Sequence, residues 1–454
     1  MPDGEIPSRV RLAILSYSTG EFDARSFRIA RSALAAGYVV MMYSRWAPGL
    51  APREERDGYT LIRVHHSWQL GVPGMRGRAR RNLAHEVAES ERRRAAGQSG
   101  AATATPAGDP VTAPARGPGL ARRVVRRGRR WTGAVQMFPL RPLGWADALD
   151  AVAAPADVWH GMWAGSLPAL VRLRRRHGGR TLYDSRDVYL QARELARLGW
   201  PLRPILAALE RRWAHAADLV LTVNEPYADL LAAQLQIPRP PVVLNCPDRW
   251  DPPVPPPDRL RAALHLPPST RVVLYQGQLI RERGIEQAMD AVLALPGTAL
   301  CLLGYGTQEA AYRARAAQPP YAGRVFVLSA VPPEALLEWT ASADVVVMPI
   351  QPTTDNHRFT TPQKLWEAIG AGVPVVASDL PGMAGIVRDA GVGALCDPTS
   401  PASIAEAILG ILDRTPEERA ALRRHVLRVA HERYTWEPQA ATLHRLYADL
   451  LARG

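Results

Sequence analysis

Short apolar segments alternate with amphipathic segments along most of the chain. Near the start, residues 11–16 are apolar, residues 27–37 have helical spacing and end on Gly37, and residues 38–44 are apolar again. This order predicts a strand, a helix and a second strand, which is the βαβ unit of a parallel sheet. Because parallel sheets bind ligands at the carboxyl ends of their strands, the loop at 17–25 is a candidate binding loop.

The same alternation continues through both halves of the chain. In the first half it predicts a long helix at 203–215 and strands at 157–160, 180–184, 218–223 and 242–244. In the second half it predicts helices at about 284–295, 307–317, 332–342 and 362–370, and strands at 271–276, 298–303, 324–328, 344–348 and 373–377.

A proline-rich tract at 247–260 interrupts this pattern and predicts an inter-domain linker. We therefore predict an α/β protein with two doubly wound, Rossmann-like domains, residues 1–250 and 251–430. Small-molecule sites favour the cleft that two such domains form between their strand ends.

Length and composition support a globular protein with more than one core. The chain has 454 residues, of which 47% are hydrophobic and 22% charged. Its net charge of +13 is concentrated in residues 74–131, where 14 Arg and four acidic residues give +10. The rest is nearly neutral, which argues against a uniformly basic nucleic-acid-binding protein. Within the basic segment, residues 95–119 are small, polar and rich in Pro and Gly, and predict a flexible insertion.

The basic segment 74–131 has three interpretations. It is a solvated loop that reflects arginine-rich codon usage, or a surface element that docks at anionic lipid and meets a lipid-linked acceptor. The third interpretation, nucleic-acid binding, is the weakest because no recognition fold is visible. We therefore expect no nucleic-acid partner and keep a peripheral membrane contact as an open alternative.

The cysteines and the apolar segments bear on the compartment. Cys246, Cys301 and Cys396 lie far apart, with neither a disulfide framework nor the spacing of metal ligands. The first residues lack the apolar core of a signal peptide, and no uninterrupted stretch of about 18 apolar residues exists. We expect a cytoplasmic protein without a metal site, at the inner membrane face if the basic segment binds lipid.

The strongest chemical signal is the window Asn356–Gly372, which contains the single lysine of the chain, Lys364. Thr361 is a good N-cap and Pro362 a favoured first helical residue, which places Lys364 in the first turn of a helix. A cation there opposes the helix dipole unless an anion is bound, so the window predicts a phosphate site. Glu367 lies on the same helix face and is able to accept hydrogen bonds from a vicinal diol such as a ribose. The alternative is an exposed Lys364–Glu367 pair of little energetic value.

Two glycine-containing turns follow strands of the second half. Gly277 permits close backbone approach after the strand 271–276, and Arg281 or Arg283 is able to reach a phosphate there. The alternative is an arginine-rich surface turn. Gly304 and Gly306 follow the strand 298–303 and suit a ligand-facing turn. Further substrate-binding candidates precede the helix that carries the lysine: Asn356, Thr360 and Thr361.

Candidates in the first half lie at predicted strand ends. His160 ends a strand and is a candidate catalytic residue, with a core histidine as the alternative. Gly20, in the loop at 17–25, and Asp184, at the end of the strand 180–184, are candidate substrate-binding residues. For Asp184, and for Arg186 and Asp187 beside it, the alternative is a structural loop cap.

Several of these segments, taken in order, resemble the family 4 glycosyltransferases of the GT-B fold. The resemblance runs from about residue 10 to 440, broken by the insertion, and rests on YQGQLIRERGIEQAM, LCLLGYG, SADVVVMPI, TPQKLWEAIGAGVPVVASDLPG and ASIAEAI. It implies a retaining transfer from a nucleotide-diphosphate sugar donor, without a metal or other cofactor, in synthesis of a polysaccharide, glycolipid or glycosylated metabolite. The C-terminal domain would hold the nucleotide and the N-terminal domain the acceptor. A last helix, within 431–454, would pack back on the N-terminal domain.

The resemblance also implies roles for single residues. Arg283 and Lys364 would neutralise the diphosphate leaving group, and Glu367 would bind ribose hydroxyls. The chain departs from the common pattern in four places. Phe359 replaces a Glu, Gln278 an Arg and Met162 a second His, and residues 184–187 read Asp-Ser-Arg-Asp where the pattern is Asp-x-His-Glu. Two alternatives remain on the same scaffold, a sugar-nucleotide epimerase and a catalytically degenerate partner subunit.

Overall fold

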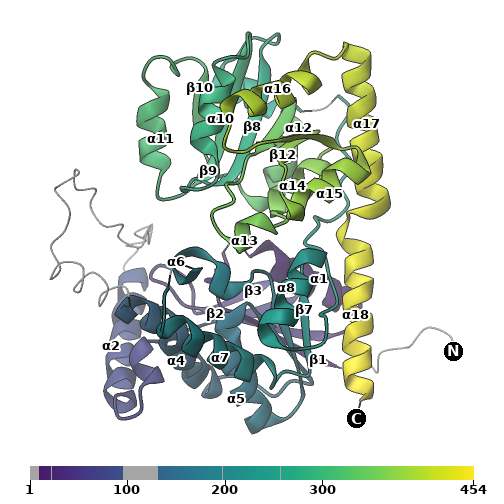
Figure 1. Cartoon of the computed structure of the whole chain (residues 1–454). Helices are drawn as coiled ribbons and strands as arrows, with labels where there is room; N and C mark the ends of the chain where they lie inside the picture. Colours follow the sequence, from purple (N-terminus) through teal and green to yellow (C-terminus); the bar gives the residue numbers. More distant parts are fainter. Residues whose placement is uncertain (1–9, 22, 96–130, 197, 256, 454) are drawn as a thin grey trace. The chain divides into compact units, whose positions relative to one another are not determined.

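The computed structural model describes residues 10–21, 23–95, 131–196, 198–255 and 257–453. Residues 96–130, the larger part of the basic segment and of the expected insertion, lie outside the described residues. The chain divides into two compact units, each built around one sheet (Figure 1). Unit 1 comprises residues up to Val243 together with the segment from Ala440, and unit 2 comprises Leu244–Gln439.

Unit 1 contains a seven-stranded sheet in the order β3-β4-β2-β1-β5-β6-β7. All neighbouring strands are parallel except β3 and β4, which pair antiparallel. The strands are β1 (Arg11–Ser16), β2 (Val39–Arg45), β3 (Arg53–Arg56), β4 (Tyr59–Val64), β5 (Val158–Met162), β6 (Arg180–Ser185) and β7 (Leu219–Thr222). Without the edge strand β3 this is the doubly wound order 3-2-1-4-5-6.

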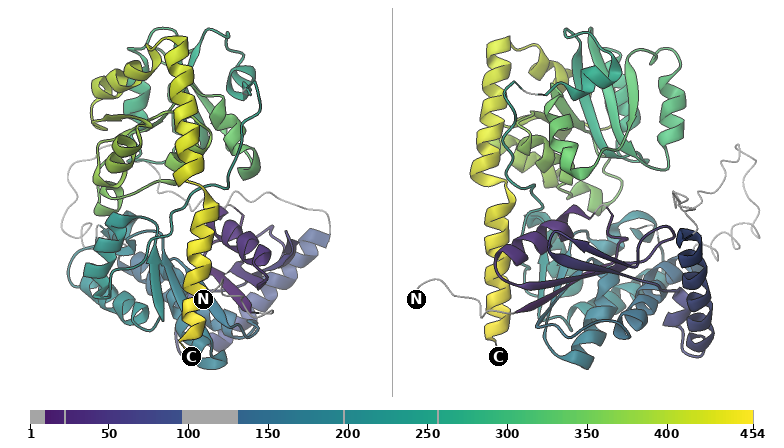
Figure 2. Two further views of the ribbon diagram at one scale, coloured as in Figure 1. Left: turned by 90° about the vertical axis from the view of Figure 1, so that its right-hand side faces the viewer. Right: turned by 180° about the vertical axis from the view of Figure 1, so that it is seen from behind.

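Helices flank the unit 1 sheet. They are α1 (Ala24–Ala35), α2 (Arg76–Ala95), α4 (Arg141–Asp150), α5 (Leu167–His177), α6 (Arg193–Ala196), α7 (Leu202–Ala214), α8 (Glu225–Leu235) and the part of the C-terminal α18 (Trp436–Ala452) that begins at Ala440. Short turns of helix complete the unit: η1 (Trp68–Gly71), η2 (Gln136–Leu140), η3 (Ala164–Ser166) and η4 (Tyr189–Gln191). Within unit 1, α2 and α18 lie on opposite sides, as Figure 2 shows.

Unit 2 contains a fully parallel six-stranded sheet in the order β10-β9-β8-β11-β12-β13, again doubly wound. Its strands are β8 (Arg271–Gln278), β9 (Thr298–Tyr305), β10 (Val325–Ser329), β11 (Val345–Met348), β12 (Val375–Ser378) and β13 (Gly393–Cys396). Its helices are α9 (Arg259–Leu264), α10 (Ile285–Val292), α11 (Glu309–Ala316), η5 (Pro333–Ala335), α12 (Leu336–Ala341), α13 (Asp355–Arg358), α14 (Gln363–Gly370), α15 (Pro381–Ala390), α16 (Pro401–Leu412) and α17 (Pro416–Arg433).

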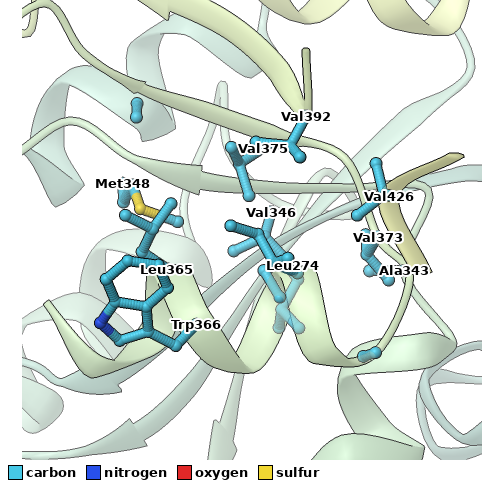
Figure 3. Packing of buried hydrophobic residues seen from close by; sticks show 14 of the residues in the cluster. Leu274, Ala343, Val346, Met348, Leu365, Trp366, Val373, Val375, Val392 and Val426 are labelled. Atoms are coloured by element: carbon cyan, nitrogen blue, oxygen red, sulfur yellow. The ribbon is translucent and has the colours of Figure 1, made fainter. Parts of the chain in front are cut away.

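Both faces of the unit 2 sheet are buried, because side chains alternate along each strand. Val272 and Leu274 of β8 belong to one core cluster, with α12, α14, α15 and α17, while Val273 belongs to the other, with α10 and α16. Figure 3 shows Leu365 and Trp366 of α14 in the first cluster. This packing fixes α14, the helix that carries Lys364, against the sheet.

The proline-rich tract packs against unit 2. The boundary between the units falls after Val243, before the predicted position at 250, and Cys246 is fully buried in a unit 2 core cluster. The Pro247 carbonyl accepts a hydrogen bond from the Trp436 amide, and Leu260, the last residue of the tract, is buried in the same cluster as Cys246. Apolar side chains within and around the prolines therefore join a core, which composition alone did not indicate.

The strand expected at 242–244 does not form. Only an isolated bridge joins Val242 to Thr222 there, because Pro240 and Pro241 supply no N–H group to a ladder. Conversely, the sequence analysis missed β3, β4 and β13. β3 reads REER and is partly exposed at the sheet edge, so it carries no hydrophobic signal.

Candidate functional site

The carboxyl edge of the unit 2 sheet gathers several of the predicted residues. β8, which ends in Gly277 and Gln278, and β11 are neighbours at the point where the strand order reverses. Doubly wound sheets bind ligands at this switch point. α14 begins a short distance after β11 and brings Lys364 and Glu367 to the end of β8.

α14 begins one residue later than expected. The N-cap is Pro362 and not Thr361. The ψ of Pro362 is 147°, which is extended, and no side chain caps the helix at this residue. The Pro362 carbonyl accepts a hydrogen bond from the Leu365 amide at 2.9 Å, so Lys364 is the second helical residue. Proline at this position keeps its usual φ and still lets the chain turn from an extended segment into the helix.

The Lys364 ammonium is buried at the end of β8. Its Nζ lies 3.6 Å from the centroid of the Tyr275 ring, a cation–π contact, and no described residue accepts a hydrogen bond from it. Burial lowers the pKa of Lys364 well below its ordinary value; nearby Arg283 lowers this pKa further, and Glu367 opposes the shift. A buried cation with so little compensation is costly in the free protein and is arranged to receive an anion.

A chain of hydrogen bonds positions Glu367. Thr340 Oγ1 lies 2.8 Å from Gln276 Oε1, and Gln276 Nε2 donates to Glu367 Oε2 at 2.7 Å. Because Thr340 and Gln276 are buried in the described structure, the carboxylate is held by the sheet as well as by its own helix. A carboxylate fixed in this way is suited to accept hydrogen bonds from ligand hydroxyls.

The loop between β8 and α10 carries the two candidate arginines. Glu282, before Arg283, is held by a hydrogen bond from the Gln351 amide to its carbonyl, and Thr353 Oγ1 donates to its carboxylate at 3.1 Å. Gly284, with φ of 70°, ends the loop where a side chain would collide with the Pro349 carbonyl. Arg283 is half-buried, while Arg281 is exposed.

The glycines of this edge permit close packing. Gly277 has φ of 112°, and a Cβ on it would lie 3.5 Å from Lys364 Nζ. Gly304 pairs with Gly277 across β8 and β9, and a Cβ there would lie 1.8 Å from the Gly277 carbonyl oxygen. A Cβ on Gly306 would lie 2.3 Å from the Leu279 carbonyl oxygen, so a side chain does not fit there either. Gly304 and Gly306 therefore have a packing role that the sequence analysis did not consider.

The remaining unit 2 candidates precede α14. Asn356 is buried in α13, whose N-cap Thr354 accepts a hydrogen bond from the His357 amide. Thr360 follows this turn, and its carbonyl lies so close to Gly382 at the start of α15 that a side chain would not fit there. These contacts hold the 356–361 segment in place; its role in binding stays a prediction.

In unit 1, His160 and Asp184 lie in the interior. His160 Nδ1 is 2.6 Å from the Tyr447 hydroxyl of α18, and Nε2 is 3.4 Å from Asp184 Oδ2. Arg25 Nε donates to the same carboxylate at 2.7 Å. Burial lowers the pKa of His160, although Asp184 opposes this shift. Both ring nitrogens are engaged inside unit 1, so we do not carry His160 into the proposed mechanism.

A second buried carboxylate organises the loop after β1. Asp23 accepts hydrogen bonds from Ser16 and Ser26 and pairs with Arg186 at 2.7 Å. Despite burial, Arg186 and these hydroxyls lower the pKa of Asp23 to about 2. Gly20 in this loop has φ of 73° and lies beside Ser44. This loop is thus fixed by its own polar network.

Sequence reasoning missed Tyr275, Gln276 and Thr340. A polar residue at the end of an otherwise apolar strand was the available signal for Gln276. Nothing local indicated Thr340, because it lies 64 positions from Gln276 and meets it only in the folded unit.

Three further structural findings concern cysteines, metals and membranes. Cys246, Cys301 and Cys396 are buried free thiols. Within the part of the chain that the structure describes, no group of three or more His, Cys, Asp or Glu side chains is arranged to hold a metal ion. No described helix combines the length and the apolar character needed to cross a membrane.

Comparisons with known proteins agree with this geometry in unit 2. Residues 257–426 match the family described as Glycosyl transferases group 1. D-inositol 3-phosphate glycosyltransferase of Corynebacterium glutamicum is 29% identical over 206 residues, 43% of this chain and 47% of that protein. Glycogen synthase of Mycobacterium tuberculosis is 29% identical over 183 residues, 38% of this chain and 42% of that protein. The chain thus matches less than half the length of these curated relatives.

Solved structures extend the likeness to both units. Sucrose-phosphate synthase from Thermosynechococcus elongatus superposes with a TM-score of 0.70 at 19% identity, covering 98% of this chain and all of that chain. HepE of Anabaena, solved with UDP and glucose, has a TM-score of 0.60 at 14% identity over 97% of this chain and 100% of its own. At such identities the likeness establishes the fold, and these neighbours are GT-B glycosyltransferases.

Proposed function

We propose that this protein transfers a sugar from a nucleotide-diphosphate sugar to an acceptor, because residues 257–426 match the family Glycosyl transferases group 1 and the chain has the GT-B fold. One observation carries the proposal: the buried Lys364 ammonium lacks an anionic hydrogen-bond partner and lies at the switch point beside Gly277. A diphosphate supplies the missing negative charge. Glu367, held by Gln276, then takes the ribose hydroxyls.

The proposed chemistry is stabilisation of a leaving group. As the bond between the anomeric carbon and the diphosphate oxygen breaks, the electron pair stays on the diphosphate. Lys364 and Arg283 neutralise this developing charge, and because the sheet and its loop already hold them, little reorganisation is needed. We propose that transfer retains the anomeric configuration, and that the acceptor binds in unit 1.

An epimerase on the same scaffold would need a free acid–base group beside the sugar ring. His160 and Asp184 instead hydrogen-bond within unit 1, which favours transfer over epimerisation. A degenerate partner subunit would lack turnover but could still bind nucleotide, so turnover with a sugar nucleotide separates it from the enzyme.

Calorimetry with UDP, GDP and ADP tests the donor site. UDP is the first choice because HepE was solved with it. We expect Lys364→Ala and Glu367→Ala each to weaken binding by about tenfold or more, since each removes a charged contact. Glu338→Ala is the matched control, because that exposed carboxylate pairs only with Arg259 on the surface of unit 2. Wild-type affinity in both site variants would mean that the nucleotide binds elsewhere.

We also propose that transfer needs no metal ion, because Lys364 and Arg283 supply the positive charge that a divalent cation supplies in other transferases. Activity with the best donor should therefore persist after dialysis against EDTA. Loss of activity that Mg²⁺ or Mn²⁺ restores would contradict this.

A peripheral membrane contact through residues 74–131 remains our proposal for a lipid-linked acceptor. Sedimentation with vesicles of phosphatidylcholine and phosphatidylglycerol tests it, with a deletion of 96–130 as the comparison. Equal sedimentation of the deletion variant and the full chain would reject a contact through residues 96–130 and leave α2 as the remaining part of the segment to test.

A further inference from the structure

Unit 1 contains a cavity of about 390 Å³ at the carboxyl edge of its sheet. Arg45, the last residue of β2, lines it, as do residues that directly follow β4. α2 and α4 contribute the remaining walls. The cavity therefore occupies, in unit 1, the kind of position at which parallel sheets bind small molecules.

Arg45 is a cation without a carboxylate partner. Its guanidinium lies 4.7 Å from the centroid of the Tyr17 ring. Its Nε atom is buried, and no described residue accepts a hydrogen bond from it. Most arginines of unit 1 with a described partner pair with an acid, for example Arg63 with Glu54 and Arg186 with Asp23. Arg45 differs because no described carboxylate pairs with it, so an anionic ligand would compensate its partly buried charge.

A second guanidinium lines the same cavity. Arg141, the first residue of α4, lies close enough to Arg45 to lower its pKa, in addition to the effect of burial. Burial, and after it the charges of both arginines, lowers the pKa of His66 to about 3. This histidine is therefore neutral, and the positive charge of the cavity comes from the two arginines. Like charges held at one cavity are stabilised when a phosphate or carboxylate binds between them.

The other walls offer groups suited to hydroxyls. Gln69 of η1 and Asn82 of α2 provide amides, Glu86 provides a carboxylate, and Trp68 provides an aromatic ring. Amides and carboxylates hydrogen-bond to sugar or polyol hydroxyls, and aromatic rings pack against their C–H faces. A site for inorganic phosphate alone would not need these groups.

We propose that this cavity binds a hydroxylated small molecule that carries one anionic group, such as a phosphorylated or carboxylated sugar, and that this molecule is the acceptor. Arg45 and Arg141 hold the anionic group, while Gln69, Asn82 and Glu86 hold hydroxyls. Its role as acceptor rests on the proposed glycosyltransferase function; the binding itself does not.

Calorimetry on the full chain tests the binding with glucose 6-phosphate, glucuronate and glucose. The anionic sugars should bind at least about tenfold more tightly than glucose, and Arg141→Ala and Arg45→Gln should each remove most of this preference. Because Arg141 is exposed, we expect Arg141→Ala to fold. This variant therefore still tests the proposal if Arg45→Gln fails to fold. Arg78→Ala, on the exposed surface of α2, is the matched control and should bind like the wild type.

Two comparisons separate the possible failures. UDP should bind normally to Arg141→Ala, and glucose 6-phosphate should bind normally to Lys364→Ala. If Lys364→Ala binds UDP like the wild type while Arg141→Ala loses affinity for glucose 6-phosphate, the donor proposal fails and the cavity proposal stands. Equal affinity for glucose and glucose 6-phosphate, or unchanged affinity in both arginine variants, would overturn the cavity proposal.

The anionic group belongs either to a soluble sugar or to a lipid headgroup. Sedimentation with vesicles of equal parts phosphatidylcholine and phosphatidylglycerol distinguishes them. Loss of sedimentation in Arg141→Ala, but not in Arg78→Ala, assigns a lipid-borne anion to the cavity. If Arg141→Ala sediments like the wild type but no longer binds glucose 6-phosphate, the anionic group belongs to a soluble sugar.

Discussion

At the scale of single residues, Lys364 shows how a binding site lowers stability. Its ammonium is removed from water without a described hydrogen-bond acceptor, and the Tyr275 ring compensates only in part. The pKa of Lys364 is lowered for the same reason, because burial and the charge of Arg283 both disfavour the charged form. We infer that the free energy lost in the empty protein is recovered when an anion binds.

We therefore expect Lys364→Met to stabilise the free protein and to abolish nucleotide binding. Methionine fills much of the same volume without a buried charge, so the free energy of unfolding should rise by about 1–2 kcal/mol. Urea unfolding and calorimetry with UDP measure the two effects. Lys364→Arg, which keeps the charge, is the control and should not be stabilised. A destabilised Lys364→Met variant that still binds UDP would refute this trade-off.

At the scale of elements, one carboxylate of α4 anchors the arginine-rich helix α2. Asp147 is only 6% exposed and lies 3.0 Å from Arg80 and 3.6 Å from Arg76 of α2, and 2.9 Å from Arg172 of α5. Part of the positive charge of the basic segment is thus used inside unit 1. Because α2 supplies Asn82 and Glu86, the same contact positions one wall of the cavity.

Asp147→Ala should loosen α2. Three ion pairs are lost, of which those with Arg80 and Arg172 are hydrogen-bonded, but the arginines are partly exposed and regain water. We therefore expect a loss of about 1–3 kcal/mol in the free energy of unfolding. Trypsin should also cleave within α2 faster than in the wild type. Asp150→Ala, at the end of the same helix, removes a single partly exposed pair with Arg176 and should have a smaller effect. Equal cleavage of both variants would show that apolar packing alone holds α2.

At the scale of the whole molecule, two doubly wound sheets differ in how they use polar residues. Unit 1 buries His160 and partly buries His65, His66 and His444, and in all four burial lowers the pKa: to about 4 for His65 and to about 3 for His66. Neutral buried histidines make the stability of this unit depend on pH.

Unit 1 should lose stability as the pH falls from about 6.5 toward 4. Histidines of the unfolded chain take up protons near pH 6.5, while the buried ones resist until a lower pH, so protonation favours unfolding in this window. The carboxylate of Asp23, with a pKa of about 2, stays charged there and does not contribute. Burial raises the pKa of Glu210 to about 8, so this single carboxyl takes up its proton in the folded chain and opposes the effect of the four histidines. Hydrogen exchange at pH 7.5 and pH 5, corrected for the intrinsic exchange rate at each pH, should show smaller protection factors in unit 1 at the lower pH. A larger loss of protection in unit 2 would contradict this.

Much of the unit 2 site was predictable from local sequence. The strand 271–276 and the helix that begins near Lys364 have strong hydrophobic spacing, and a strand followed by a turn reliably brings its last residues to the sheet edge. The geometry of Lys364 and Glu367 follows from the helix repeat. The N-cap was misplaced by one residue because proline suits both the cap and the first turn.

Unit 1 was less predictable because its polar residues meet over long distances in the sequence. His160 and Tyr447 are 287 positions apart, and their hydrogen bond exists only once α18 lies against the sheet. The cavity likewise needs Arg45 from β2 and Arg141 from α4 to meet. No local pattern distinguishes these arginines from the many that pair with acids on the surface.

By itself, the sequence determined the fold class, most strands and several helices, and it led to our proposal of which residues would receive a diphosphate. These properties depend on periodicity and on neighbours within one or two turns, which a sequence records directly. Only the tertiary structure decided that the proline-rich tract joins a core, that His160 is an interior residue and that two arginines share a cavity. Each of these depends on which distant side chains exclude water together, and burial of that kind exists only in the folded chain.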